Sequence, residues 1–477
     1  MGDRRTGAEK GIAAVQRLGH MEGRAGFGVI LRLINLWWFQ VVGPHCLCYL
    51  VSHVSPAFEG KGFGEFAVEK PLSVAASPAA ESAEFEDPSY SWVFALFGVT
   101  LGMWIGLLAA AQVLLPSQIE AIDPSDKVWL MGAVTTSGAV AAVLAAPVMG
   151  ALSDRTRWGF GKRRCWVLGG IACCAAALLT MSRQSSVVVV GICWTIVHGG
   201  VGGIHAVLCA IIPDKVPVHR RGTVFAILGF AQPLGLVLGT LLVSGLSVGV
   251  GYPVVAALVV VLALPYALIG RDVPAAAEPS PVGRWLPDPS ALGRDFGWAW
   301  AGRFAAQFAT SLATIYLLYF LRDQIKMGDP AKGVAVLSLL YTAGIVTVSL
   351  VVGRISDRVR KRKVFVILAA VLMAGALTGM ALVPTWPTAV AAATALGAGY
   401  GAYLAVDQAL ATQLLRSEGD RGKDLGTMNM STSAAVAIAP VVAAESVAYG
   451  GYPMLFFLAA GMAVLGGFLV QPIKSVR

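Results

Sequence analysis

The segment Gly150–Arg164 reads GALSDRTRWGFGKRR and lies between two long apolar runs. A weaker copy, GRISDRVRKRK, occupies Gly353–Lys363 and also lies between two apolar runs. Both copies contain Gly-x-(Leu/Ile)-Ser-Asp-Arg, and Asp357 follows Asp154 by 203 positions (357 minus 154). An internal repeat of about 200 residues therefore organises the chain.

The composition indicates a membrane protein. The 477 residues are 56% hydrophobic and only 13% charged, whereas a soluble domain carries about 25% charged residues. The apolar residues form continuous runs close to the roughly 20 residues that cross the hydrocarbon core of a bilayer. We therefore predict an all-α, multi-pass protein whose first partner is the lipid bilayer.

Twelve apolar spans can be drawn from Ser91 onward, six on each side of a segment rich in Pro, Ala and Arg. We predict an amino-terminal six-helix half (91–270), a cytoplasmic linker (271–296) and a carboxy-terminal six-helix half (297–477). The spans cover residues 91–115, 129–149, 165–181, 186–211, 223–247, 253–270, 297–321, 334–352, 364–382, 388–413, 425–446 and 452–470.

Residues 1–90 lie outside the repeat and form an amino-terminal extension. The apolar run 28–54 is interrupted by polar residues, so two interpretations stay open: an extra membrane-associated helix, or a start site assigned too far upstream. The segment 70–88 is small, polar and acidic, which is typical of a disordered tail. We expect residues 1–64 to be dispensable.

The loop at 150–164 resembles the signature loop between helices 2 and 3 of the major facilitator superfamily. Its longer form, Arg157-Trp-Gly-Phe-Gly-Lys-Arg-Arg, is similar to that of the glycoside–pentoside–hexuronide cation symporters and the sucrose/proton symporters. The resemblance implies two pseudo-symmetric halves with a solute site at their interface. It also implies a conformational role for the two loop copies, through Gly150, Asp154, Arg155, Gly161, Arg163, Arg164, Gly353, Asp357 and Arg358. In this family the Asp meets the start of helix 11, here near 425–427, so Asp154 is expected to act as a latch that stabilises the outward-facing state.

The net charge of +9 is distributed unevenly over the loops. Lys and Arg concentrate in the loops that share a side with 150–164, which is the positive-inside pattern of a cell-membrane protein. We therefore place this side and both termini in the cytoplasm. The basic excess orients the chain and does not indicate a nucleic-acid partner.

Two charged residues lie deep in the drawn spans. A charge inside the bilayer costs about 2.5–3.5 kcal/mol on insertion scales, so such residues are candidate functional groups. Arg303 and Asp407 lie at similar depths in spans 7 and 10, and a pairing between them is expected. Asp407 is the predicted proton carrier, because burial opposes its ionisation while Arg303 favours it. A static ion pair is the alternative interpretation.

The fourth span contains His198 and His205, which are second candidates for proton transfer. A neutral histidine bonded to a backbone carbonyl is the commoner case. Glycines lie between these histidines, and a Gly-x-Gly-x-Gly run at 397–401 lies in the tenth span. Small residues let helices approach closely, so we interpret both runs as packing sites.

Several neutral polar and aromatic residues lie on the helices expected to line a central cavity. Amides and aromatic rings together suit a hydroxylated solute such as a sugar. The candidate cavity residues are Gln112, Gln232, Gln307, Tyr316, Tyr341, Tyr400, Tyr403, Gln408 and Asn429.

The sequence contains no phosphate-binding loop, zinc-protease motif or nucleophile elbow. We expect no enzyme, no cofactor and no metal. The sodium-coupled, melibiose-type members of the family that this chain resembles place their cation-binding acids in helices 1 and 2. The first two drawn spans contain no acid, so the resemblance disfavours sodium coupling and leaves protons. The prediction is a monomeric secondary transporter that takes up a sugar or glycoside by proton symport. A proton-coupled exporter of hydrophobic compounds and a transport-inactive sensor stay open as alternatives.

Overall fold

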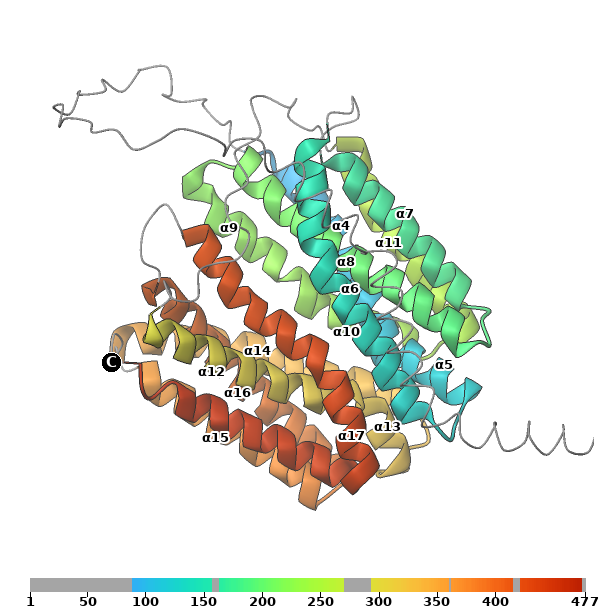
Figure 1. Cartoon of the computed structure of the whole chain (residues 1–477), viewed down its shortest axis with the longest axis vertical. Coiled ribbons are helices and arrows are strands. Elements are labelled where there is room, and N and C mark those ends of the chain that lie inside the picture. The colour runs from blue at the N-terminus through green and yellow to red at the C-terminus, as the bar shows by residue number, and fades with distance from the viewer. Residues whose placement is uncertain (1–87, 157–162, 270–292, 360–361, 415–420, 474–477) are drawn as a thin grey trace, which may run out of the picture. The chain divides into compact units, whose positions relative to one another are not determined.

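A computed structural model describes residues 88–156, 163–269, 293–359, 362–414 and 421–473. The chain divides into two compact units, Met1–Ala83 and Glu84–Arg477, and the predictions for residues 1–87 and most of the 271–296 linker fall outside the described residues. The second unit is a helical bundle (Figure 1). Its helices are α4 (Tyr90–Ala109), η2 (Ala110–Leu114), α5 (Leu115–Ile122), α6 (Lys127–Arg155), α7 (Arg164–Met181), α8 (Val187–Lys215), α9 (Val218–Gly229), α10 (Ala231–Val243), α11 (Val248–Ile269), α12 (Arg294–Ile315), α13 (Leu317–Asp323), α14 (Pro330–Val359), α15 (Arg362–Leu382), α16 (Trp386–Leu414) and α17 (Arg421–Leu469).

These helices correspond to the twelve predicted spans. Ten helical stretches among the described residues are long and apolar enough to cross a membrane. The stretch inside α17 holds two spans, because the chain leaves helical geometry at Gly451, whose φ of 68° suits glycine. Helices α12 and α13, bent by 43° at their junction, form one more span. The described residues thus contain twelve spans.

The first span is longer than predicted and changes its helical pitch. The predicted end was residue 115, but the helix continues through Pro116 to Ile122. Pro116 has no N–H to donate to the carbonyl of Gln112, and the chain forms one turn of π-helix at this point, η2. A π-helical turn inside a long helix is frequently found at a functional site.

Within each half, helices pack through the predicted glycines. A Cβ added at Gly202 of α8 would lie 2.7 Å from the carbonyl oxygen of Ala142 in α6. A Cβ at Gly401 of α16 would lie 2.5 Å from the carbonyl oxygen of Ile345 in α14, and Gly397 is closer still to Tyr341. The packing interpretation of both glycine runs is confirmed, because no larger residue fits at these crossings.

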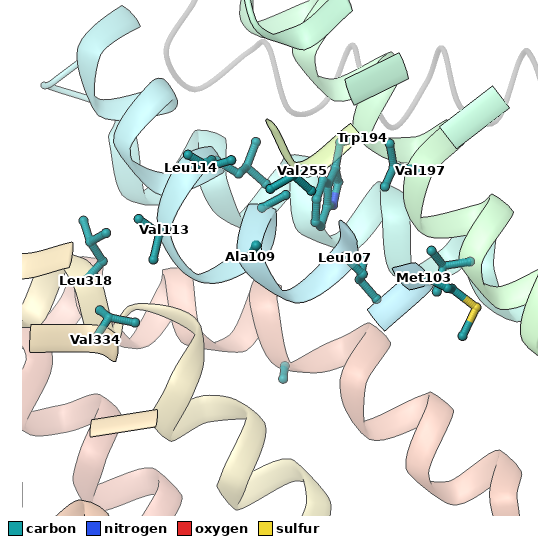
Figure 2. Packing of buried hydrophobic residues seen from close by; sticks show 14 of the residues in the cluster. Met103, Leu107, Ala109, Val113, Leu114, Trp194, Val197, Val255, Leu318 and Val334 are labelled. Atoms are coloured by element: carbon teal, nitrogen blue, oxygen red, sulfur yellow. The ribbon is translucent and has the colours of Figure 1, made fainter. Parts of the chain in front are cut away.

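The two halves contact each other at one end of the bundle. We call the end where α6 finishes and α7 begins the basic end, and the opposite end the far end. At the far end, η2 packs against α13 and α14. Figure 2 shows Val113 of η2 beside Leu318 and Val334 in this shared apolar core. The α6 helix also meets α17 there, with Gly132 facing Ala444.

Candidate functional site

A buried ion pair lies between the seventh and tenth spans. Nη2 of Arg303 in α12 is 2.5 Å from Oδ2 of Asp407 in α16. Both residues are buried, with 5% and 7% of their surfaces exposed. The expected pairing of the two intramembrane charges is therefore present, and each charge offsets the cost of burying the other.

Neighbouring polar groups complete the surroundings of this pair. The hydroxyl of Tyr403 donates to Oδ1 of Asp407 at 3.2 Å, and Nη1 of Arg303 donates to Oδ1 of Asn429 at 3.4 Å. Nε of Arg303 is buried without a hydrogen-bond partner among the described residues. A cavity of about 10 Å³ borders Tyr403 and Asp407, which is room for about one water molecule.

A second polar group lies one helical turn from Arg303. The Tyr400 hydroxyl donates to Oε1 of Gln307 at 2.5 Å, and Nε2 of Gln307 donates to the Ser311 hydroxyl at 3.5 Å. Tyr400 stacks on Tyr341 and on Tyr403, with ring centroids 6.4 and 6.3 Å apart. The predicted residues Gln307, Tyr341, Tyr400, Tyr403 and Asn429 thus form one continuous cluster with Arg303 and Asp407, which we call the central cluster.

The other predicted cavity residues lie elsewhere. Gln112 lies on the π-helical turn and is half-buried, whereas Gln232 of α10 is exposed. Asn429 is exposed as well. The side chain of Gln408 lies outside the described residues. Tyr316 is not part of the central cluster, because it is buried at the far end.

Both histidines contact residues of the amino-terminal half. His198 packs edge-to-face on Trp194 and beside Gly138. His205 is exposed and packs on Trp104, with its Nε2 3.7 Å from Sγ of Cys209. Both histidines therefore belong to the amino-terminal half, whereas the residues of the central cluster belong to the carboxy-terminal half.

The signature loop is organised by Arg163. This buried side chain contacts Asp154 at 2.9 Å and Asp214 of α8 at 2.7 Å, and its Nη1 donates to the Ser153 hydroxyl at 3.3 Å. In this state Asp154 is therefore bonded within the amino-terminal half.

The remaining loop residues have varied positions. Gly161 and the side chain of Asp357 lie outside the described residues, and α17 begins at Arg421, one turn before the expected 425–427. Gly150 and Gly353 have space around them, Arg155 ends α6, Arg164 begins α7, and Arg358 is exposed near the end of α14.

A charged network that the sequence did not suggest joins the halves at the far end. Nζ of Lys127 lies 2.9 Å from Glu120 in the same half and 2.8 Å from Asp323 in the other half. Arg322 pairs with Glu120 across the interface, and the Tyr452 hydroxyl donates to Asp323 at 2.7 Å. We call these five residues the far-end network. It holds this end of the bundle closed.

Two tyrosines at the bend of the seventh span extend this closure. The Tyr316 hydroxyl donates to the carbonyl of Val128 at 2.8 Å, and the Tyr319 hydroxyl donates to that of Pro116 at 3.0 Å. Tyr319 also presents its ring to Lys127, whose Nζ is 5.0 Å from the centroid. Both hydrogen bonds join the carboxy-terminal half to the amino-terminal half. The bend between α12 and α13 is therefore a site of contact between the two halves.

The described residues contain no group of three or more His, Cys, Asp or Glu side chains placed to hold a metal ion. Among the described cysteines, Cys173, Cys174, Cys193 and Cys209 are free thiols.

Comparisons with known proteins agree with this architecture. The family model described as Major Facilitator Superfamily matches residues 112–339 and 299–475. A crystal structure of a variant of the nucleoside transporter NupG aligns over 80% of this chain and 100% of its own, with a TM-score of 0.64 and 14% identity. The human organic anion transporter MFSD10 (TETRAN) aligns over the same shares, with a TM-score of 0.58 and 19% identity. No curated protein matches the sequence.

Proposed function

Because the chain belongs to the major facilitator superfamily, it is a multi-pass membrane transporter of small solutes rather than an enzyme, and we propose that it imports a sugar or glycoside by proton symport. The basic end faces the cytoplasm in this proposal, on the side that collects most Lys and Arg, and the protein resides in the cell (inner) membrane with both termini inside.

The observation that carries the proposal is the Arg303–Asp407 pair. It lies inside the spans, 2.5 Å apart and buried, in direct contact with tyrosine and amide groups that bond hydroxyls. A titratable acid beside a solute site couples the two when protonation and binding favour the same state. Asp407 takes up the proton, Arg303 responds to the change in charge, and Gln307, Tyr400 and Asn429 hold the solute hydroxyls.

Alternating access follows from the far-end network. With the basic end in the cytoplasm, the closed far end corresponds to an inward-facing state, and the exposed Gln232 and Asn429 face the cytoplasmic water. Rocking of the halves breaks the far-end network and closes the basic end. Asp154 then leaves Arg163 and meets the amino-terminal end of α17, where a carboxylate is favoured by the helix dipole.

The test measures proton movement when solute is added to cells that express the protein. In weakly buffered medium, a pulse of sugar or glycoside from a panel is expected to alkalinise the medium, and Asp407→Asn is expected to abolish this signal. In de-energised cells, an added hydrophobic compound would enter through a proton-coupled exporter in exchange for protons, so acidification of the medium would identify an exporter instead. The absence of solute-dependent proton movement across both panels would favour a sensor and overturn the proposal.

A further inference from the structure

The central cluster holds one positive and one negative side chain, and its net charge decides which solutes it can carry. The charged groups buried in the described spans near the solute site are Arg303 and Asp407. As an ion pair they are neutral, which suits two charges that are buried inside membrane spans. Protonation of Asp407 changes this balance.

When Asp407 is protonated, Arg303 is left with an uncompensated positive charge. A neutral sugar cannot compensate that charge, and an unpaired charge at this depth costs about 2.5–3.5 kcal/mol on insertion scales. A solute with one carboxylate restores neutrality, because its charge replaces that of Asp407. The site is then neutral in both states in which the halves rock, empty with Asp407 ionised and loaded with Asp407 protonated.

The guanidinium of Arg303 has donors that no hydrogen bond within the described part of the chain satisfies in this state. Nη2 lies 2.5 Å from Oδ2 of Asp407, but both Nη2 and Nε are buried without a hydrogen bond of ordinary geometry to the described residues. Nη1 reaches the amide oxygen of Asn429 at 3.4 Å, and Asn429 is exposed. The guanidinium therefore lies one side chain away from the exposed surface. Its planar set of donors matches the two oxygens of a carboxylate.

The same cluster supplies partners for hydroxyls. Gln307 bonds Tyr400 and Ser311 one helical turn along α12 from Arg303. These amide and hydroxyl groups both donate and accept hydrogen bonds, so they suit the remaining polar atoms of a hydroxylated acid.

We infer that the transported sugar or glycoside is an acidic one, a hydroxylated organic monocarboxylate whose carboxylate binds Arg303 in place of Asp407 while Asp407 carries the proton. This inference rests on the proposed proton symport and names the solute class. The proton enters from water on the loading side, is held on the Asp407 carboxyl during the crossing and is released on the other side when Asp407 re-forms its pair with Arg303.

Among the described residues, few charged or titratable groups contact Asp407, so its titration can be assigned to these contacts. Arg303 from α12 and Tyr403 from α16 itself are its charged or titratable contacts. Apolar side chains also lie beside it, namely Val366 of α15 and, after the end of α17, Val470 and Ile473. The amide of Asn429, which lies on α17, bonds the guanidinium.

The test compares matched pairs of compounds that differ in the carboxylate: gluconate with glucose, glycerate with glycerol and lactate with 1,2-propanediol. Thermal unfolding of the purified full chain is followed in detergent at about pH 5.5 and about pH 7.5, where such acids are ionised. At least one carboxylate is expected to bind about tenfold more tightly than its neutral counterpart, or tighter still. This is the size of the effect that one hydrogen bond to a charged group produces. Its binding is expected to be tighter at the lower pH.

Two variants assign the effect to the pair. Asp407→Asn mimics the protonated acid, so carboxylate binding is expected to persist and to lose its dependence on pH. The double variant Arg303→Gln/Asp407→Asn strands no charge and is expected to fold, but to lose the preference for carboxylates. Equal binding of neutral and acidic partners, a preference that survives in the double variant, or no stabilisation by any carboxylate would overturn the inference.

Transport in proteoliposomes separates this inference from the proposed function. Uptake of the preferred acid is expected to follow the pH gradient and to be insensitive to an imposed potassium diffusion potential, because one proton and one carboxylate cross together. Proton-coupled uptake of a neutral sugar that responds to the potential would overturn the carboxylate assignment and leave proton symport intact. Carboxylate uptake without proton movement would overturn proton symport instead.

Discussion

Lys127 in the second span lies 2.8 Å from Asp323 in the seventh, so one ion pair ties the two halves of the bundle together at the far end. Lys127 also neutralises Glu120 at 2.9 Å, and its side chain is 14% exposed. The pair is thus partly shielded from water, which distinguishes it from the surface pairs that contribute little.

Lys127→Gln is expected to shift the population away from the closed far end. The change removes two charged contacts, each worth about 1.5–3 kcal/mol when shielded, and leaves Asp323 facing Glu120. Hydrogen exchange of the backbone amides in 115–122 and 317–323 is expected to become faster, because both segments are held by this closure.

Lys332→Gln provides the matched control for this change. Lys332 pairs with Asp329 at 2.8 Å at the same end of the bundle, but within one half and with both side chains well exposed. Exchange in the two segments is expected to be unaffected. Equal exchange rates in the Lys127 and Lys332 variants would show that the far-end network does not hold the gate.

Gly397→Ala is expected to destabilise the carboxy-terminal half. The added methyl group would overlap the backbone of Tyr341 in α14, and overpacking of this kind costs about 1–3 kcal/mol or more. Gly375→Ala in α15 makes the same chemical change where nothing lies within 4 Å. Its unfolding temperature is expected to stay the same or rise, since alanine favours helix over glycine. Similar unfolding temperatures for the two variants would contradict the close α14–α16 contact.

The central cluster and the far-end network differ in how far the sequence predicts them. Arg303 and Asp407 stand out because charges are rare inside apolar spans, and helical rise alone places them at the same depth. Glu120, Lys127, Arg322 and Asp323 lie at span ends, where charges cost little and are common. Their partners are 196 and 202 positions away. No local sequence pattern indicates which helix ends contact each other in the folded protein.

The first span shows a second limit of sequence patterns. The predicted first span ended at residue 115, which placed Glu120 outside the spans. In the structure the helix absorbs the proline by forming a π-helical turn and continues to Ile122. The packing of η2 against α13 and α14 stabilises this continuation, and such tertiary contacts are invisible in a single sequence.

Asp154→Asn is expected to slow transport several-fold while equilibrium solute binding stays within a few-fold of wild type. Asp154 is more than half exposed and bonded to Arg163 in this state, so it has no role in the central cluster. Its charge is expected to stabilise the state in which the basic end is closed. Asp126→Asn, at the exposed opposite end of α6, is the control and is expected to transport normally. A large loss of solute affinity in Asp154→Asn, with an unchanged balance of conformations, would rule out the latch.

Asp407→Asn is expected to abolish uphill accumulation but to preserve exchange of solute across the membrane. Exchange needs no net proton movement, whereas accumulation against a gradient requires the carboxyl to bind a proton on one side and release it on the other. Counterflow and gradient-driven uptake are measured side by side in proteoliposomes.

The two possible roles of the Arg303–Asp407 pair predict different results in that experiment. If the pair only holds α12 against α16, removing Asp407 strands a buried guanidinium and both activities fall together. Adding Arg303→Gln would then restore stability and part of both activities, because no unpaired charge is left. If Asp407 is the coupling group, the double variant stays unable to accumulate solute whatever its stability. Normal uphill uptake by Asp407→Asn would exclude both roles and direct attention to His198 and His205 in α8.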